Sequence, residues 1–154
     1  KLQQAQAHLP HPDDALMVED AGLFVDALDG FPGVYSAYVL KTLGCNGILK
    51  LMEGDNNRNA EFRAVAALLL DGDVFISRGV CQGALAAEAS GEDGFGFDPI
   101  FVPNDLKREG IVQTTNGLTF ADVDLSVKEK FSHRRKALDG LLELLSTPEA
   151  ASSS

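Results

Sequence analysis

The alternation of apolar and polar positions predicts a β-hairpin near the middle of the chain. Two apolar, strand-like runs cover residues 62–70 and 74–80, and Asp71, Gly72 and Asp73 separate them. An Asp-Gly pair between two such runs is among the strongest short-range signals for a hairpin turn. We therefore expect an antiparallel pair of strands at this place.

Shorter apolar runs predict three more strands. These are residues 15–18, 83–89 and 100–102. Glu19 and Asp20 follow the first run directly, and residues 22–35 are rich in Gly, Asp and Pro, which is typical of a loop. The first strand is thus expected to end at an acidic pair that leads into a loop.

Helical spacing of apolar residues appears in three segments. One covers residues 2–9, and a second begins at Ser36 and is interrupted near Gly44. Ser126 and Glu129 have the spacing of a capping box, which predicts that a long C-terminal helix opens there. Together with the strands, this order predicts an α/β fold with a long twisted mixed sheet flanked by helices. We expect one domain over residues 1–148 and a flexible tail at 149–154.

Composition and charge narrow the classes of protein. The chain has 154 residues, 45% of them hydrophobic, which is enough for one domain with a real core. A net charge of -10 argues against binding to a nucleic-acid backbone, and no apolar run is long enough to span a membrane. We also see no signal-peptide pattern and therefore expect a cytoplasmic protein. Cys45 and Cys81 lack metal-ligand spacing, so we expect reduced, structural thiols.

Residues 91–101 carry the most specific pattern, GEDGFGFDPIF. Glycine allows close approach of a ligand, Phe95 and Phe97 offer rings, and Asp98 offers a carboxylate that Pro99 pushes toward an extended conformation. Two interpretations are open. The segment either binds a planar ligand or is a core loop with two buried rings and a turn-capping aspartate.

Two charged groups are the other candidates for a functional site. Glu19 and Asp20 stand where α/β proteins commonly place ligands, or they form a solvated strand end. Ser132, His133 and Arg134 form a basic island in an acidic chain, or a solvated helix face. Spacing alone does not decide between these alternatives.

Taken together, the three blocks resemble the inosine triphosphate pyrophosphatase family, also called Ham1-like. The resemblance extends from Val18 to Leu145 in family order and implies the long mixed sheet of the Maf/Ham1 architecture, Mg²⁺ as cofactor and a homodimer. The implied activity is hydrolysis of non-standard purine nucleoside triphosphates (ITP, dITP and XTP) to the monophosphate and pyrophosphate. The alternatives are a non-catalytic nucleotide-binding or dimerisation remnant, and a related pyrophosphatase for pyrimidine or modified nucleotides.

The resemblance also implies roles for single residues. It assigns Asp20 to Mg²⁺ and to water activation, and we place Glu19 beside it at the metal. Phe95 would stack on the purine and Asp98 would accept N1-H of a 6-oxo base, which adenine lacks. The remaining substrate-binding positions are Ala21, Gly96, Phe97, Lys128 at the phosphates, and His133 and Arg134 at O6.

Two features depart from the family pattern. The family's first strand, its Thr-x-Asn-x-x-Lys phosphate loop and a second metal-binding glutamate have no counterpart in the sequence, so we expect about one β-α-β unit ahead of Lys1 to be missing. Ala21 stands where many members carry Ser or Thr, so only a backbone contact is implied at that position.

Overall fold

The computed structural model describes residues 15–91 and 95–146. In chain order its strands are β1 (Leu16–Val25), β2 (Asn59–Leu70), β3 (Asp73–Leu85), β4 (Phe101–Pro103), β5 (Leu106–Arg108) and β6 (Ile111–Gln113). Its α-helices are α2 (Ser36–Thr42), α3 (Gly44–Leu51), α4 (Leu125–Lys128) and α5 (His133–Ser146). Three short 3-10 helices are η1 (Asp26–Leu28), η2 (Gly33–Tyr35) and η3 (Asp98–Ile100).

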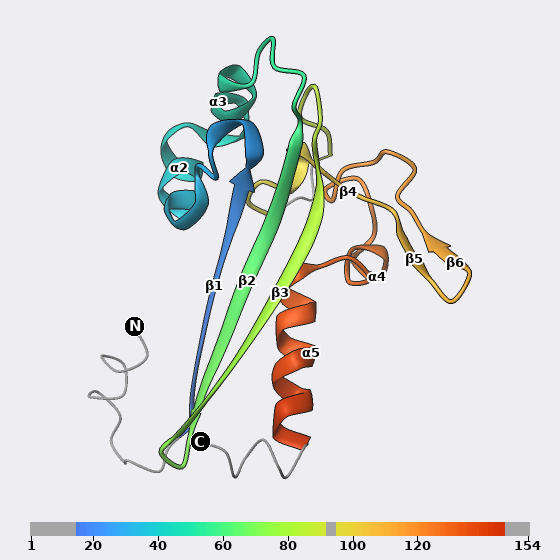
Figure 1. The fold of residues 1–154 in the computed structure, drawn as a ribbon. Coiled ribbons are helices and arrows are strands. Elements are labelled where there is room, and N and C mark those ends of the chain that lie inside the picture. The colour runs from blue at the N-terminus through green and yellow to red at the C-terminus, as the bar shows by residue number, and fades with distance from the viewer. Residues whose placement is uncertain (1–14, 92–94, 147–154) are drawn as a thin grey trace.

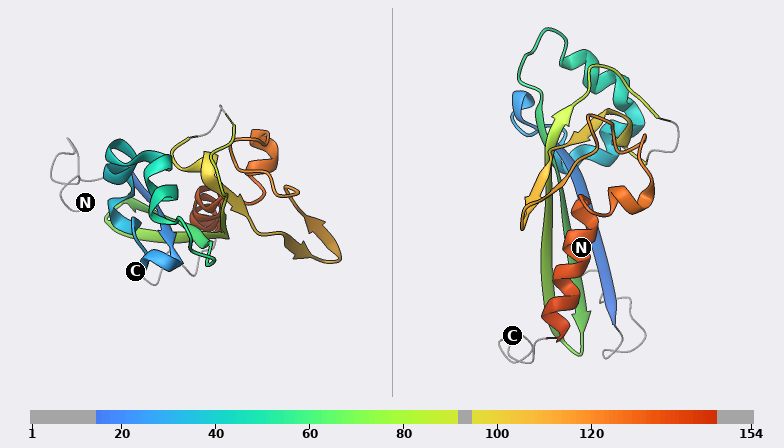
Figure 2. Two further views of the ribbon diagram at one scale, coloured as in Figure 1. Left: turned by 90° about the horizontal axis from the view of Figure 1, so that it is seen from above. Right: turned by 90° about the vertical axis from the view of Figure 1, so that its right-hand side faces the viewer.

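One long sheet of order β1-β2-β3-β4 forms the frame, and β5 pairs with β6 in a separate small hairpin (Figure 1). Helix α5 lies along one face of β2 and β3, whereas α2 and α3 gather at the end of the sheet where β1 finishes (Figures 1 and 2). The α/β fold with flanking helices is confirmed. All strand pairings in the described ranges are antiparallel, so the parallel pairing implied by the predicted mixed sheet does not occur in them.

The central hairpin is confirmed at the predicted turn. Leu70 pairs with Asp73, and the two residues between them, Asp71 and Gly72, have φ of 52° and 83°. Positive φ at both central positions is the geometry of the two-residue turn that suits the twist of paired strands. Strand β3 continues as far as Leu85, so the predicted separate strand at 83–89 is wrong, because its first three residues extend the hairpin.

Strand β1 is longer than predicted. The sequence places Glu19 and Asp20 at the end of a strand, but β1 pairs with β2 from Leu16 to Val25 without a break. The expected loop at 22–35 therefore begins only after Val25, where η1 starts. The buried side chains of Leu23 and Val25 explain the extension, since both belong to the main hydrophobic core.

The C-terminal helix is divided in two, which corrects the capping-box prediction. Asp124, rather than Ser126, precedes the short helix α4, and α5 begins only at His133. Between them the chain turns and buries Phe131, which is 1% exposed. Burying this ring in the core favours the break over a continuous helix.

Helix α5 approaches β3 closely because two glycines lie between them. A Cβ at Gly79 would overlap the carbonyl oxygen of His133, and one at Gly140 would overlap Oγ of Ser77. These contacts fix the height at which α5 starts above the sheet. They thereby set the position of His133.

The main core lies between the sheet, α3 and the segment that contains η3 and β4. Its fully buried members include Leu23, Ile48, Met52, Ile100 and Phe101. None of the described helices is long and apolar enough to cross a membrane. The predicted helix at 2–9 and the proposed tail from 149 lie outside the described residues.

Candidate functional site

A cavity of about 460 Å³ brings the three predicted blocks together. It opens between β1, the segment that leads into η3, and the helices α4 and α5. Of the residues expected at the site, it is lined by Glu19, Ala21, Phe95, Gly96, Phe97, Asp98, Lys128, His133 and Arg134. This volume lies within the range of small-molecule pockets, so the cavity has room for a nucleobase.

The two phenylalanines have different surroundings. Phe95 is 66% exposed at the cavity, whereas Phe97 is 4% exposed and belongs to the core. Gly96 between them has φ of 62°, a conformation that lets successive side chains diverge here and that favours glycine. The core-loop interpretation therefore holds for Phe97, and Phe95 is the ring that a planar ligand can reach.

Asp98 is buried and already has two partners. Its Oδ2 atom accepts a hydrogen bond from the backbone N-H of Phe95 at 3.1 Å and pairs with Nζ of Lys128 at 2.5 Å. The residue opens the helix η3, so the extended conformation predicted from Pro99 is wrong, and the N-H of Ile100 bonds instead to the carbonyl of Phe97. The pairing of one oxygen with Lys128 leaves Oδ1 as the atom that can face a ligand.

Lys128 was expected at the phosphates, but the structure places its ammonium against Asp98. It also lies 5.7 Å from the ring centroid of Phe120, and its side chain is 22% exposed. The ammonium therefore balances a buried carboxylate, which would otherwise be costly to keep ionised. Its contact with phosphate stays a prediction.

His133 is held inside the cavity wall as a neutral imidazole. It is 5% exposed and stacks on Phe62, with ring centroids 4.6 Å apart and an interplanar angle of 14°. Burial, reinforced by the nearby cations Arg134, Lys128 and Lys136, lowers its pKa from 6.5 to about 3. Its Nδ1 makes no hydrogen bond within the described part of the chain, so a polar atom is available at the buried end of the site.

Arg134 crosses the cavity from α5 to β1. Its guanidinium carbon lies 5.0 Å from the ring centroid of Phe95, and its Nε lies 3.2 Å from Oε1 of Glu19. The predicted basic island is therefore divided in its roles. His133 faces inward, and Arg134 spans the opening.

The acidic pair is separated by the geometry of the strand. Glu19 and Ala21 line the cavity, whereas the intervening Asp20 points to the opposite face of β1, because successive strand side chains alternate. The structure therefore does not bring Glu19 and Asp20 onto one ion.

No group of three His, Cys, Asp or Glu residues suited to a metal occurs in the described ranges. Mg²⁺ commonly binds through one or two carboxylates together with phosphates and water, and the exposed Asp20 fits that kind of site.

Phe62 and Ser36 also line the cavity and are not among the predicted site residues. Phe62 forms the platform under His133, and Ser36 fixes the edge of β1 by accepting the N-H of Leu23 at 2.8 Å and donating to the carbonyl of Gly33 at 2.7 Å. Phe62 lies in an ordinary apolar strand pattern, which carries no signal of a site. The Gly33 to Ser36 segment carries a weak signal, since a glycine lies shortly before Ser36, the first residue of α2.

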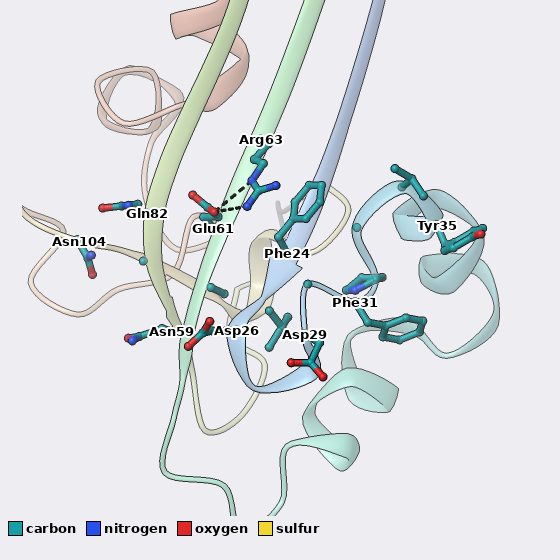
Figure 3. A pocket seen from close by; sticks show the side chains of 17 residues that line it. Phe24, Asp26, Asp29, Phe31, Tyr35, Asn59, Glu61, Arg63, Gln82 and Asn104 are labelled. Atoms are coloured by element: carbon teal, nitrogen blue, oxygen red, sulfur yellow. Dashed lines mark hydrogen bonds and ion pairs between the residues drawn. The ribbon is translucent and has the colours of Figure 1, made fainter.

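A larger cavity, of about 960 Å³, lies elsewhere and contains none of the predicted site residues (Figure 3). There Arg63 lies between Glu61 and Phe24, with an ion pair of 2.6 Å and its guanidinium 4.0 Å from the ring centroid (Figure 3). The guanidinium of Arg63 and the ring of Phe24 are therefore already paired with each other.

The frame and the smaller cavity together define an α/β protein with a pocket suited to a nucleobase. The chain belongs to the Ham1 family, whose model matches residues 1–144. It is 48% identical over 126 residues to the dITP/XTP pyrophosphatase of Thermococcus kodakarensis, covering 82% of this chain and 62% of that protein. The Pyrococcus horikoshii dITP/XTP pyrophosphatase is 43% identical over 137 residues, with 89% of this chain and 67% of that protein covered.

Solved structures agree with this assignment. The Ham1 protein of Staphylococcus aureus superposes with a TM-score of 0.76 at 28% identity, covering 94% of this chain and 73% of that one. A dITP/XTP pyrophosphatase from Mycobacterium abscessus gives a TM-score of 0.68 at 31% identity, covering 93% of this chain and 70% of that one. The chain spans about two thirds of the length of the curated relatives it matches.

Proposed function

We propose that this chain hydrolyses non-standard purine nucleoside triphosphates, namely ITP, dITP and XTP, to the monophosphate and pyrophosphate. The observation that carries the proposal is that the smaller cavity is lined jointly by Phe95, Asp98, His133 and Arg134. The names of the relatives, dITP/XTP pyrophosphatase, support the substrate class.

The base would be selected by the chemistry of the cavity wall. Phe95 offers a ring face for stacking, and Oδ1 of Asp98 accepts N1-H of hypoxanthine or xanthine. Adenine has no hydrogen at N1 and would leave this buried acceptor unpaired, at a cost of about 1–3 kcal/mol. Arg134 would donate to O6, where adenine carries an amino group that cannot accept in the same way.

The phosphate chemistry would take place on the other side of β1. Water attacks the α-phosphorus, the bond from that phosphorus to the bridging oxygen breaks, and pyrophosphate leaves. Asp20 accepts the proton of the attacking water and, with phosphate oxygens and water molecules, would hold Mg²⁺. When bound, the cation offsets charge on the phosphates and makes the water more acidic.

The decisive experiment measures pyrophosphate release from ITP, XTP, ATP and GTP in the presence of Mg²⁺. We expect release from ITP and XTP well above that from ATP, and loss of activity in Asp20→Asn. Equal rates on all four nucleotides, or an unimpaired variant, would refute the assignment. Asp139→Asn, a carboxylate change on α5 outside both cavities, is the control for non-specific damage.

A second candidate is a non-catalytic nucleotide-binding module. It is favoured by one observation, the lack of any three-residue metal-binding group among residues 15–91 and 95–146. Calorimetry distinguishes the two functions. A binding module gives similar affinities for IMP and for ITP with Mg²⁺, whereas a working site gains affinity from the triphosphate.

We also propose that the protein forms a homodimer. Phe31, Val34, Tyr35 and Tyr38 are exposed, and the first three line the larger cavity, so apolar and aromatic surface gathers at one place (Figure 3). Such surface is typical of protein interfaces. Light scattering should give twice the chain mass for the native sequence and a smaller mass for Val34→Glu. A native monomer at micromolar concentration would contradict the proposal.

We further place the protein in the cytoplasm, because its proposed substrates are free nucleotides. Cell fractionation followed by immunodetection tests this placement. Recovery in a membrane or extracellular fraction would overturn it.

A further inference from the structure

Arg134 is anchored at two points, and one of them is a carboxylate from a distant part of the chain. Its Nε lies 3.2 Å from Oε1 of Glu19 on β1, and its guanidinium lies 5.0 Å from the ring centroid of Phe95. All three side chains line the smaller cavity. The ion pair therefore ties α5 to β1 directly across the place where a base would enter.

The atoms used in this contact leave the other donors of the guanidinium available. Arginine has five N-H groups in a planar fork, and the Glu19 carboxylate lies 3.2 Å from the nitrogen that carries one of them, Nε. The terminal nitrogens form no hydrogen bond within residues 15–91 and 95–146, so they can meet an acceptor on a ligand. With Nε held by a carboxylate and the plane beside an aromatic ring, the direction of the fork is restricted.

Stability alone does not account for the pair. The side chains of Arg134 and Glu19 are 48% and 38% exposed, and ion pairs as exposed as this contribute little to folding. A metal-binding role does not account for Glu19 either, because its carboxylate faces Arg134 while Asp20 points to the other face of the strand. The remaining consequence of the ion pair is that the long, flexible side chain of Arg134 is already restricted before a ligand arrives. This restriction lowers the entropic cost of binding.

We propose that Glu19 is a positioning residue that holds Arg134 in the orientation that recognises the 6-oxo edge of the purine. The proposal rests on the proposed function for the identity of the base. It makes Glu19 part of base selection and separates it from the phosphate chemistry assigned to Asp20.

The test uses equilibrium binding of IMP and AMP, which differ at the base edge and need no triphosphate site. Glu19→Gln should weaken IMP binding by about 10-fold and AMP binding by less than about 2-fold, because the carboxylate that orients Arg134 is lost. Glu19→Gln combined with Arg134→Gln should bind IMP no more weakly than Arg134→Gln alone, since one residue acts through the other. The matched control is Glu61→Gln, which removes the carboxylate partner of Arg63 at a place where neither residue lines the smaller cavity, and it should leave both affinities unchanged.

Other outcomes overturn the inference. If Glu19→Gln weakens IMP and AMP equally, or adds its full effect to that of Arg134→Gln, Glu19 does not act through the arginine. An unchanged IMP affinity likewise overturns it. If Glu19→Gln instead raises the Mg²⁺ concentration needed for half-maximal pyrophosphate release, Glu19 belongs to the metal site.

The same measurements separate this inference from the proposed function. Native protein that prefers IMP over AMP but releases no pyrophosphate from ITP refutes the hydrolase and leaves Glu19 to be judged by binding. Native protein that hydrolyses ITP, together with a fully selective Glu19→Gln, refutes only the inference. Native protein with no preference for IMP refutes both.

Discussion

Protonation of His133 should couple the stability of the fold to pH in the mildly acidic range. The folded pKa of about 3 is lowered mainly by burial, whereas an unfolded chain should titrate near 6.5. Above pH 6.5 both states are neutral and pH has no effect through this group. Below 6.5 the unfolded state binds a proton that the folded state refuses, so stability is lost as pH falls toward 3.

The expected magnitude follows from the two pKa values. The loss is about 1.4 kcal/mol for each pH unit between the two values, so a change from pH 7 to pH 5 removes about 2 kcal/mol. For a single domain this is a large part of the usual free energy of unfolding. No discount for solvent screening is needed, because the ring is 5% exposed.

Urea unfolding at pH 7, 6 and 5 measures the effect by comparison with His133→Phe. Phenylalanine keeps a ring on Phe62 but cannot be protonated, so the variant should lack this part of the pH dependence. The other two histidines of the chain and all carboxylates are present in both proteins, and their contributions cancel in the difference. His133→Gln provides a second non-titrating variant.

The reasoning would be refuted if the stability difference between native protein and both variants stayed constant from pH 7 to pH 5. That result would mean that His133 titrates alike in the folded and unfolded states. It would also mean that the cavity wall does not keep the imidazole of His133 neutral as the pH falls.

Three other experiments test the site and its support. Phe95→Ala should weaken IMP binding by about 1–3 kcal/mol through lost stacking and change the stability of the fold little, whereas Phe97→Ala should cost about 3–5 kcal/mol of stability. Calorimetry measures the binding and thermal melts measure the stability. Similar melting temperatures for the two variants would contradict the assignment. Lys128→Met leaves Asp98 with an uncompensated buried charge, so urea unfolding should show a loss of about 3–5 kcal/mol that Asp98→Asn in the same chain largely relieves; no relief would contradict the pairing. Gly79→Ala forces α5 away from β3, and a stability loss below about 1 kcal/mol would show that the helix is not fixed there.

The fold could be predicted where the signal is local. Asp71 and Gly72 specify their turn through their own backbone preferences, and the alternating pattern around them specifies the strands. Predictions failed where burial overrides local preference. Gly22 suggests a loop but lies within β1, and Ser126 suggests a helix start but the burial of Phe131 divides that helix.

The site could be predicted only in part for a similar reason. The chemistry of Phe95 and Asp98 is visible in their own segment, but the partners of these residues come from elsewhere in the chain. Lys128 on α4 reaches Asp98, and Glu19 on β1 reaches Arg134, and neither pair has a local sequence signature. Family resemblance placed these residues near one another, and only coordinates could say which of them touch.

The register in which β1 pairs with β2 decides on which face of the sheet each proposed functional side chain lies. Glu19 lies opposite Ala66 and Asp20 opposite Val65, and neighbouring positions face opposite sides of the sheet. A slip of a single residue would exchange the two carboxylates, turning the proposed proton acceptor toward the base and the arginine's partner toward the phosphates. Such a slip would also move Leu23 and Val25, which are buried further along the same strand, out of the core. The packing that stabilises the domain therefore also keeps each carboxylate on its own face of the sheet.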